Sequence, residues 1–253
     1  AYLNMAPSQT LKWIESGKMP SEQDVEIQGT EPYIVGGHTA SGFWVDTNRE
    51  TTIQGLFAAG DVAGGCPQKY VTGALAEGKI ASLAIVEQLK NSDEKEPAAF
   101  DRKAEEILKS YEQIRNTENT LFTVDDLEEA MQKVMDEYAG GISSNYQFNE
   151  KQLDLAEEKI LKLKDLAEKT GAEDMHELLF AYELKERLLV CQVLIEHLKN
   201  RKETRWHSFN ENLDHPETSK DFEKYVNSRM ENGKIKILFR ELVKGDTYEH
   251  TNS

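Results

Sequence analysis

Apolar residues recur at alternating three- and four-residue steps through the middle of the chain, from about residue 97 to residue 200. This spacing places them on one face of an α-helix. The pattern predicts an antiparallel bundle of helices that acts as a scaffold. The four apolar stripes are Phe100, Ala104, Ile107, Tyr111 and Ile114; Leu127, Met131, Val134 and Tyr138; Leu153, Ala156, Ile160, Leu163 and Ala167; and Ala181, Leu184, Leu188, Cys191, Ile195 and Leu198.

Residues with capping chemistry stand at the expected ends of these helices. Pro97 suits the first turn of the first helix, where its missing N–H is not needed. Thr123 and Asn149 precede the second and third helices, where a side-chain oxygen can accept a hydrogen bond from a free N–H. Gly171 stands where we expect the third helix to end. The polar stretch 91–96 is expected to be a linker.

The first 90 residues mix short elements of both kinds. A short helix is predicted over 7–16, with Gly17 as its stop. Residues 25–46 are rich in glycine and in β-branched or aromatic residues, which favours short strands and turns. Residues 51–59 contain an apolar run that fits a buried strand, and a glycine-rich loop and a helix over about 72–89 follow. This order predicts one βα unit of an α/β fold.

Towards the C-terminus the helical periodicity stops, and a strand is predicted over Ile235 to Phe239. We therefore expect an α+β chain that is mainly α. Its parts are the end of an α/β domain (1–90), an antiparallel helical bundle domain (91–200) and a small C-terminal α+β segment (201–253).

The net charge of −16 at pH 7 bears on the partners. It repels nucleic acid phosphates and anionic membranes, so we expect neither as a partner. A basic protein partner would suit it, although most acidic proteins are simply well solvated. No apolar run approaches the ~20 residues that a membrane span needs, and the first ten residues do not resemble a signal peptide. We expect a cytoplasmic protein.

The two cysteines, Cys66 and Cys191, stand far apart in the sequence. Two thiols cannot ligate a four-cysteine iron–sulfur cluster or a structural zinc ion, so no metal site is expected. Cys191 falls on the apolar face of a helix and is expected to be buried. Cys66 lies in the glycine-rich loop and is the better candidate for a reactive thiol, but no neighbouring base is evident.

The strongest chemical signal lies in residues 55–81. The predicted strand brings Gly60 and Asp61 to its C-terminal end, where α/β folds place ligands. Asp61 can accept hydrogen bonds from ligand hydroxyls, and the small residues 63–65 allow close approach of the backbone. The free N–H groups at the start of the next helix can stabilise an anion. A plain turn is the alternative interpretation.

The segments GLFAAGD and GALAEGKIA resemble the second FAD-contacting motif of the fumarate reductase and succinate dehydrogenase flavoproteins. The resemblance implies FAD as the cofactor of a longer chain, with residues 1–90 forming the end of a capping region and the second FAD-contacting part. It implies that Gly60 and Asp61 lie at the ribityl or ribose hydroxyls. It also implies that the backbone of Ala74 and Leu75 lies near the pyrimidine edge of the flavin, where a helix N-terminus suits negative charge.

Lys69 stands where the respiratory members of this superfamily carry a substrate-binding arginine. A lysine lacks the bidentate fork that suits a carboxylate, which argues against succinate or fumarate as substrate. Within the superfamily, the chain resembles the α subunits of adenylylsulfate reductases. VGGHTASGFWVD is similar to their histidine-containing segment, and ETRWHSF to their C-terminal TRW segment. The chain departs from them at Gly37 and at Cys66-Pro67.

This likeness puts His38 in the position of the active-site histidine. Its titration near neutral pH would suit acid–base work or anion binding, and a hydrogen-bonded turn residue is the alternative. Arg205 can bind an oxyanion of the substrate or pair with one of the 46 acidic residues. Trp206 can stack on adenine or pack in a core.

The resemblance implies an enzyme that interconverts adenylylsulfate with AMP and sulfite. It also implies a separate iron–sulfur subunit as electron-transfer partner. No G-x-G-x-x-G fingerprint occurs in the chain, so we expect a C-terminal part that is inactive alone and binds flavin weakly. Two rivals remain open. One is a flavoenzyme of this superfamily that acts on a dicarboxylate or amino acid, such as an L-aspartate oxidase. The other is a non-catalytic helical interaction module with a vestigial flavin segment.

Overall fold

The computed structural model describes residues 7–18, 22, 42–65, 71–91, 99–117, 121–205 and 210–242. The chain divides into two compact units, residues 1–33 and 34–253. In the first unit lies helix α2 (Pro7–Ser16). It ends at Gly17, which has a φ of +64° and donates its N–H to the Ile14 carbonyl at 3.2 Å. The predicted helix and its stop are confirmed.

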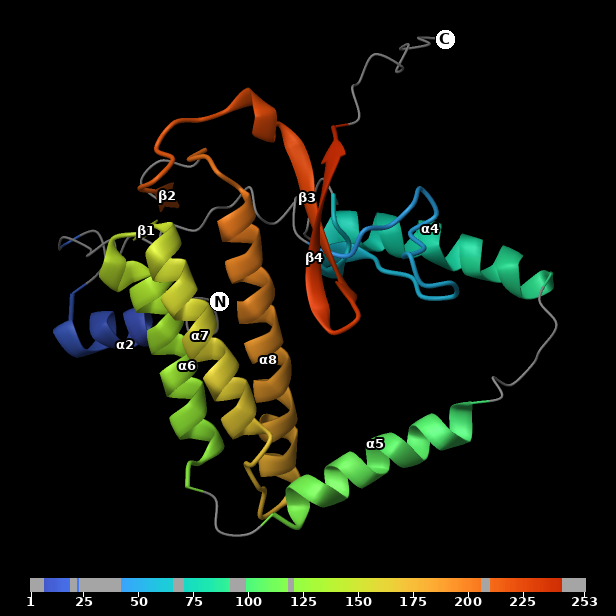
Figure 1. The fold of residues 1–253 in the computed structure, drawn as a ribbon, viewed down its shortest axis with the longest axis horizontal. Helices are drawn as coiled ribbons and strands as arrows, with labels where there is room; N and C mark the ends of the chain where they lie inside the picture. The colour runs from blue at the N-terminus through green and yellow to red at the C-terminus, as the bar shows by residue number, and fades with distance from the viewer. Residues whose placement is uncertain are drawn as a thin grey trace. The chain divides into compact units, whose positions relative to one another are not determined.

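The second unit is mainly helical (Figure 1), which confirms the predicted α+β, mainly α, class. Its elements are α4 (Val71–Lys90), α5 (Phe100–Arg115), α6 (Val124–Tyr138), α7 (Glu150–Ala167) and α8 (Met175–Asn200), the strands β1 (Gln147–Phe148), β2 (Glu211–Asn212), β3 (Lys224–Glu231) and β4 (Lys234–Glu241), and the 3-10 turns η2 (Gly60–Val62), η3 (Ile142–Ser144) and η4 (Lys220–Phe222). Within the described part of the chain, no helix has the length and apolar character that crossing a membrane requires.

Helices α6, α7 and α8 pack together and bury the predicted apolar stripes (Figure 1). Leu153, Ile160, Leu184 and Leu188 are at most 1% exposed. The predicted caps are also present. Thr123 and Asp126 form a capping box at the start of α6, and the Asn149 side chain accepts the Gln152 N–H at 2.8 Å. Since caps and stripes depend on residues within a few positions, the sequence could specify them.

Helix α5 forms as predicted, but only its C-terminal end is packed. Ile114 is 5% exposed and lies in a small cluster with Ala181 of α8. Phe100 and Ile107 of the same stripe are 57% and 49% exposed. An amphipathic pattern predicts a helix, but its apolar stripe is buried only where other parts of the chain pack against it. Pro97 lies outside the described residues.

Gly171 does not mark the end of α7, because the helix ends four residues earlier, at Ala167. The glycine serves a close approach instead. A Cβ built on Gly171 would lie 2.3 Å from the carbonyl oxygen of Thr117. The next residue, Ala172, donates its N–H to the Ile114 carbonyl at 3.3 Å. Gly171 therefore lets the segment after α7 pass against the end of α5.

The predicted buried strand over residues 51–59 is wrong. The Leu56 N–H donates to the Ile53 carbonyl at 3.1 Å, which closes a turn, and Gly55 has a φ of +81°. Ile53 and Leu56 are 64% and 46% exposed, and only Ala58 in this run is buried. The Thr51 hydroxyl also accepts the Ile53 N–H at 3.1 Å. Local hydrogen bonds of this kind compete with strand pairing.

Strands β3 and β4 form an antiparallel hairpin, with Tyr225 opposite Arg240 and Glu231 opposite Lys234. The predicted strand Ile235 to Phe239 is confirmed within β4, but β3 was missed. Asn232 and Gly233 connect the strands with φ values of +51° and +76°. Asn-Gly is a strong hairpin signal, because this turn needs positive φ at both positions. Strands β1 and β2 are a two-residue parallel pair.

Candidate functional site

Gly60 lies against the first turns of α4, and its position requires a glycine. It is buried and has a φ of +72°, a backbone conformation that glycine adopts readily and that is strained for a residue with a side chain. A Cβ built on it would lie 3.1 Å from the Cβ of Ala74. Its N–H donates to Oε2 of Glu77 at 3.0 Å. The structure thus brings Gly60 and Ala74, two of the predicted cofactor residues, directly together.

Glu77 is a site residue that the sequence reasoning missed. Its side chain is 5% exposed, and its Oε1 lies 3.5 Å from Nε of Arg49. Among the described residues, neither Oε1 nor that Nε has a hydrogen-bond partner, so charge attraction is what joins them. The available signal was spacing: Glu77 lies on the face of α4 that holds Ala74 and Ala81, where a carboxylate needs a reason to be buried.

The residues beside this contact are accessible to a ligand. Asp61 of η2 is exposed, and the Leu75 side chain is 70% exposed. Asp61 therefore directly follows the fixed Gly60 at an exposed position. The loop is held by Glu77, and an exposed acidic residue and small residues at a helix start follow it. Groups of these kinds can contact ligand hydroxyls and an electron-rich ring edge. The residues that precede α4, among them Lys69 and Cys66, lie outside the described part.

The described end of the predicted histidine-containing segment, from Gly42 to Asp46, runs beside the glycine-rich loop. Phe43 donates its N–H to the Val62 carbonyl at 2.7 Å, and its own carbonyl accepts the Gly64 N–H at 2.8 Å. A Cβ on Gly42 would lie 2.6 Å from backbone atoms of Ala63 and Gly64. These two stretches approach closely because glycines stand at the contact. His38 itself lies outside the described residues, so its role stays a prediction.

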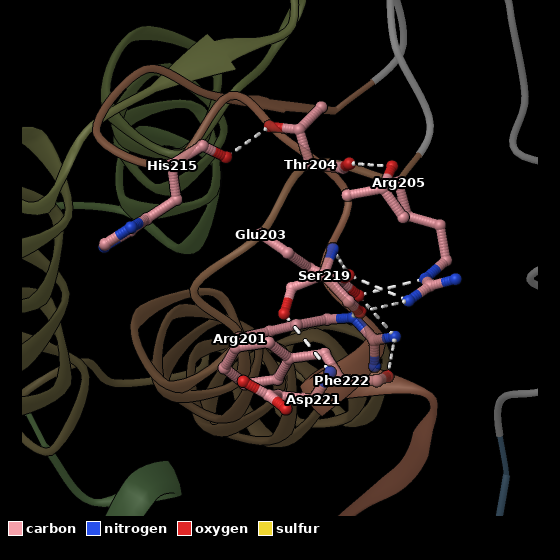
Figure 2. A network of polar contacts seen from close by, with 9 residues as sticks. Arg201, Glu203, Thr204, Arg205, His215, Ser219, Asp221 and Phe222 are labelled. Carbon is pink, nitrogen blue, oxygen red and sulfur yellow. Dashed lines mark hydrogen bonds and ion pairs between the residues drawn. The ribbon is translucent and has the colours of Figure 1, made fainter.

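The second predicted region is the cluster around Arg205, shown in Figure 2. The carboxylate of Glu203, whose side chain is 0% exposed, lies between two arginines. Arg201 donates through Nε at 2.8 Å, and Arg205 donates through Nε and Nη2 at 3.0 and 2.8 Å. The Ser219 N–H adds a fourth bond at 3.0 Å. Arg205 therefore pairs with an acid, and its predicted contact with a substrate oxyanion stays a prediction.

Burial acts to raise the pKa of Glu203. The hydrogen bonds from Arg205 and Ser219, together with the charges of both arginines, outweigh burial and lower the pKa below its ordinary value. Glu203 is therefore ionised at neutral pH. Trp206 lies outside the described residues.

Cys191 is half-buried and packs against the bundle core. Burial, and then the charge of Glu128, raises the pKa of its thiol. A thiol of this kind is a poor nucleophile.

No family model matches the chain. It is 27% identical to the adenylylsulfate reductase subunit alpha of Megalodesulfovibrio gigas, over 82% of this chain and 36% of that protein. It is 31% identical to an uncharacterized FAD-dependent oxidoreductase of Methanocaldococcus jannaschii, over 76% of this chain and 35% of that protein. The chain therefore spans just over a third of the length of these relatives.

Solved structures give the same picture. The adenylylsulfate reductase of Archaeoglobus fulgidus has a TM-score of 0.82 and 32% identity, over 96% of this chain and 43% of that one. The quinol fumarate reductase subunit FrdA of E. coli has a TM-score of 0.68 and 21% identity, over 79% of this chain and 36% of that one. At that lower identity, the likeness concerns the fold alone.

Fold and sequence together define a class: the chain is similar to part of FAD-dependent oxidoreductases, and it shares the fold of fumarate reductase flavoproteins. Within that class, it is a homologue of the adenylylsulfate reductase α subunits.

Proposed function

We propose that this chain forms the C-terminal part of an FAD-dependent oxidoreductase that interconverts adenylylsulfate with AMP and sulfite. The observation that carries the proposal is the Gly60 loop. Glu77 holds it against α4 through a 3.0 Å hydrogen bond, and it presents Asp61 in the exposed position that a flavin hydroxyl needs. The homology to adenylylsulfate reductase α subunits supports this choice of substrate.

In this proposal the chain's own residues bind and orient. Asp61 accepts hydrogen bonds from ribityl or ribose hydroxyls of FAD, and the backbone of Ala74 and Leu75 faces the pyrimidine edge. FAD, when bound, would supply the two-electron chemistry. His38 acts as an acid–base or anion-binding group. Lys69 adds positive charge beside the substrate.

Arg205 contacts an oxyanion of the substrate in the same proposal. When AMP and sulfite join, two electrons leave, and a separate iron–sulfur subunit takes them. The two cysteines of this chain are too few to ligate a four-cysteine cluster.

The test uses the full-length protein loaded with FAD. We expect sulfite to reduce ferricyanide only when AMP is present, with two ferricyanide ions consumed per sulfite, and succinate to give no activity. His38→Ala should abolish the reaction while leaving FAD bound, and Asp61→Ala should lower FAD affinity. A flavin-loaded protein that is inert to sulfite plus AMP would refute the proposed substrate. A full-length protein that does not bind FAD would refute the cofactor.

A further inference from the structure

Arg205 is held along one edge of its guanidinium group. Nε and Nη2 donate to the two oxygens of Glu203, and Nη2 also donates to the Ser219 carbonyl at 3.0 Å. A guanidinium carries five N–H donors. Among the residues that the structure describes, no acceptor for the Nη1 N–H groups is found, and the side chain is 28% exposed. Figure 2 shows one nitrogen of Arg205 turned away from Glu203.

The backbone that carries Arg205 is fixed as well. The preceding residue, Thr204, is 1% exposed. Its N–H donates to the Glu217 carbonyl at 3.1 Å, and its hydroxyl donates to the His215 carbonyl at 2.9 Å. The same hydroxyl accepts the Asn212 N–H at 2.9 Å. With both its backbone and its Nε edge fixed, Arg205 has lost most of its conformational freedom before any ligand arrives.

The two arginines of the cluster differ in how Glu203 holds them. Arg205 meets both carboxylate oxygens, and Arg201 meets Oε1 alone. Arg201 uses Nε on Glu203, and its Nη2 both lies 2.8 Å from Glu203 and donates to the Phe222 carbonyl at 2.9 Å. It thereby ties the end of α8 to η4. One carboxylate between two arginines leaves the cluster with one positive charge, within a chain of net charge −16. A local positive charge of this kind attracts an anion. Arg205 is the arginine whose direction is set by both oxygens of Glu203.

We propose that Glu203 is a positioning residue, which holds Arg205 so that its Nη1 edge faces the anionic group of the nucleotide substrate. This inference rests on the proposed function, in which that nucleotide is AMP or adenylylsulfate. Glu203 does not touch the substrate. Its two oxygens accept hydrogen bonds from Nε and Nη2 of Arg205 and so fix the orientation of the guanidinium group. A phosphate or sulfate oxygen then binds to an arginine that is already oriented.

The test compares the binding of AMP and adenosine to the FAD-loaded full-length protein by isothermal titration calorimetry. Adenosine lacks the phosphate, so the ratio of the two dissociation constants isolates the contact to the anion. We expect Glu203→Gln and Arg205→Lys each to weaken AMP binding about tenfold or more, because a charge-assisted hydrogen bond is lost or misdirected. Adenosine binding should stay within about twofold. Arg201→Lys is the matched control, since it perturbs the same carboxylate, and it should leave the ratio unchanged.

Each outcome decides the question. An unchanged ratio in Arg205→Lys and Glu203→Gln, or an equal change in Arg201→Lys, would overturn the positioning role and leave the proposed function intact. If Glu203→Gln does not fold, Glu203→Asp replaces it, since it keeps the charge and shortens the reach by one methylene group. A wild-type protein that binds neither AMP nor adenosine would overturn the proposed function, and this inference with it.

Discussion

The Glu77 side chain of α4 holds the Gly60 loop, and removing its carboxylate should lower the stability of the folded chain. Oε2 accepts the Gly60 N–H at 3.0 Å, and Oε1 faces Nε of Arg49 at 3.5 Å. Glu77→Ala deletes both contacts. Glu77→Gln keeps an oxygen for the Gly60 N–H and deletes only the charge that Arg49 faces. We therefore predict that both variants are less stable than the wild type and that the alanine variant is the less stable of the two.

The size of each effect follows from burial. A buried N–H left without an acceptor costs about 1–3 kcal/mol. The ion pair contributes less, about 0.5–1 kcal/mol, because the Arg49 side chain is 23% exposed and no hydrogen bond joins the pair. We expect the free energy of unfolding to fall by about 1.5–4 kcal/mol in Glu77→Ala and about 0.5–1 kcal/mol in Glu77→Gln.

Urea unfolding followed by circular dichroism measures these losses. A double-mutant cycle that combines Glu77→Gln with Arg49→Met isolates the charge contribution. In the full-length protein, flavin fluorescence should report weaker FAD binding in the alanine variant. Equal losses in the alanine and glutamine variants would refute the reasoning, because they would mean that the hydrogen bond to Gly60 adds nothing.

Three further predictions follow from other parts of the molecule. Gly171→Ala should destabilise the chain by about 1–3 kcal/mol in urea unfolding, since its Cβ would lie 2.3 Å from the Thr117 carbonyl oxygen; an unchanged midpoint would contradict that contact. Ile160→Ala, at a 0% exposed position, should cost about 2–5 kcal/mol, and a loss below that range would mean that the bundle core is loosely packed. Folding lowers the pKa of the Glu203 carboxyl, so its ionised form stabilises the folded state when the pH is above the pKa that this carboxyl has in the unfolded chain. The stabilisation is lost as the pH falls through the pKa of the carboxyl in the folded state. The stability difference between wild type and Glu203→Gln, measured from neutral pH into acid, should therefore shrink; a constant difference would exclude the ionised cluster as its cause.

The sequence by itself determined the features that depend on near neighbours. The stripes of α6, α7 and α8 and the caps at Thr123 and Asn149 lie where the pattern predicted them. Helical periodicity and capping act within a few residues, so a local pattern can specify them. The start of α4 and its place after Gly60 followed in the same way from the glycine-rich loop and the apolar helix.

The hairpin lies between these cases. Asn232 and Gly233 carried a local signal for it, and applying the turn rule there would have predicted β3 as well as β4. For residues 51–59 the opposite holds. A short apolar run fits both a buried strand and a turn, and only the surrounding chain decides which forms. Here a turn forms, in which the Thr51 hydroxyl accepts the Ile53 N–H and Gly55 has a positive φ.

Only the tertiary structure decided which distant groups complete the charged clusters. Glu203 lies two positions from both Arg201 and Arg205, but the N–H and carbonyl of Ser219 that complete the cluster come from a later part of the chain. Glu77 and Arg49 lie 28 positions apart in the sequence and meet because α4 folds back on the loop before it. Electrostatic and hydrogen-bond partners depend on distance in space and on burial. The pairs that define the candidate site therefore become visible only once the chain is folded.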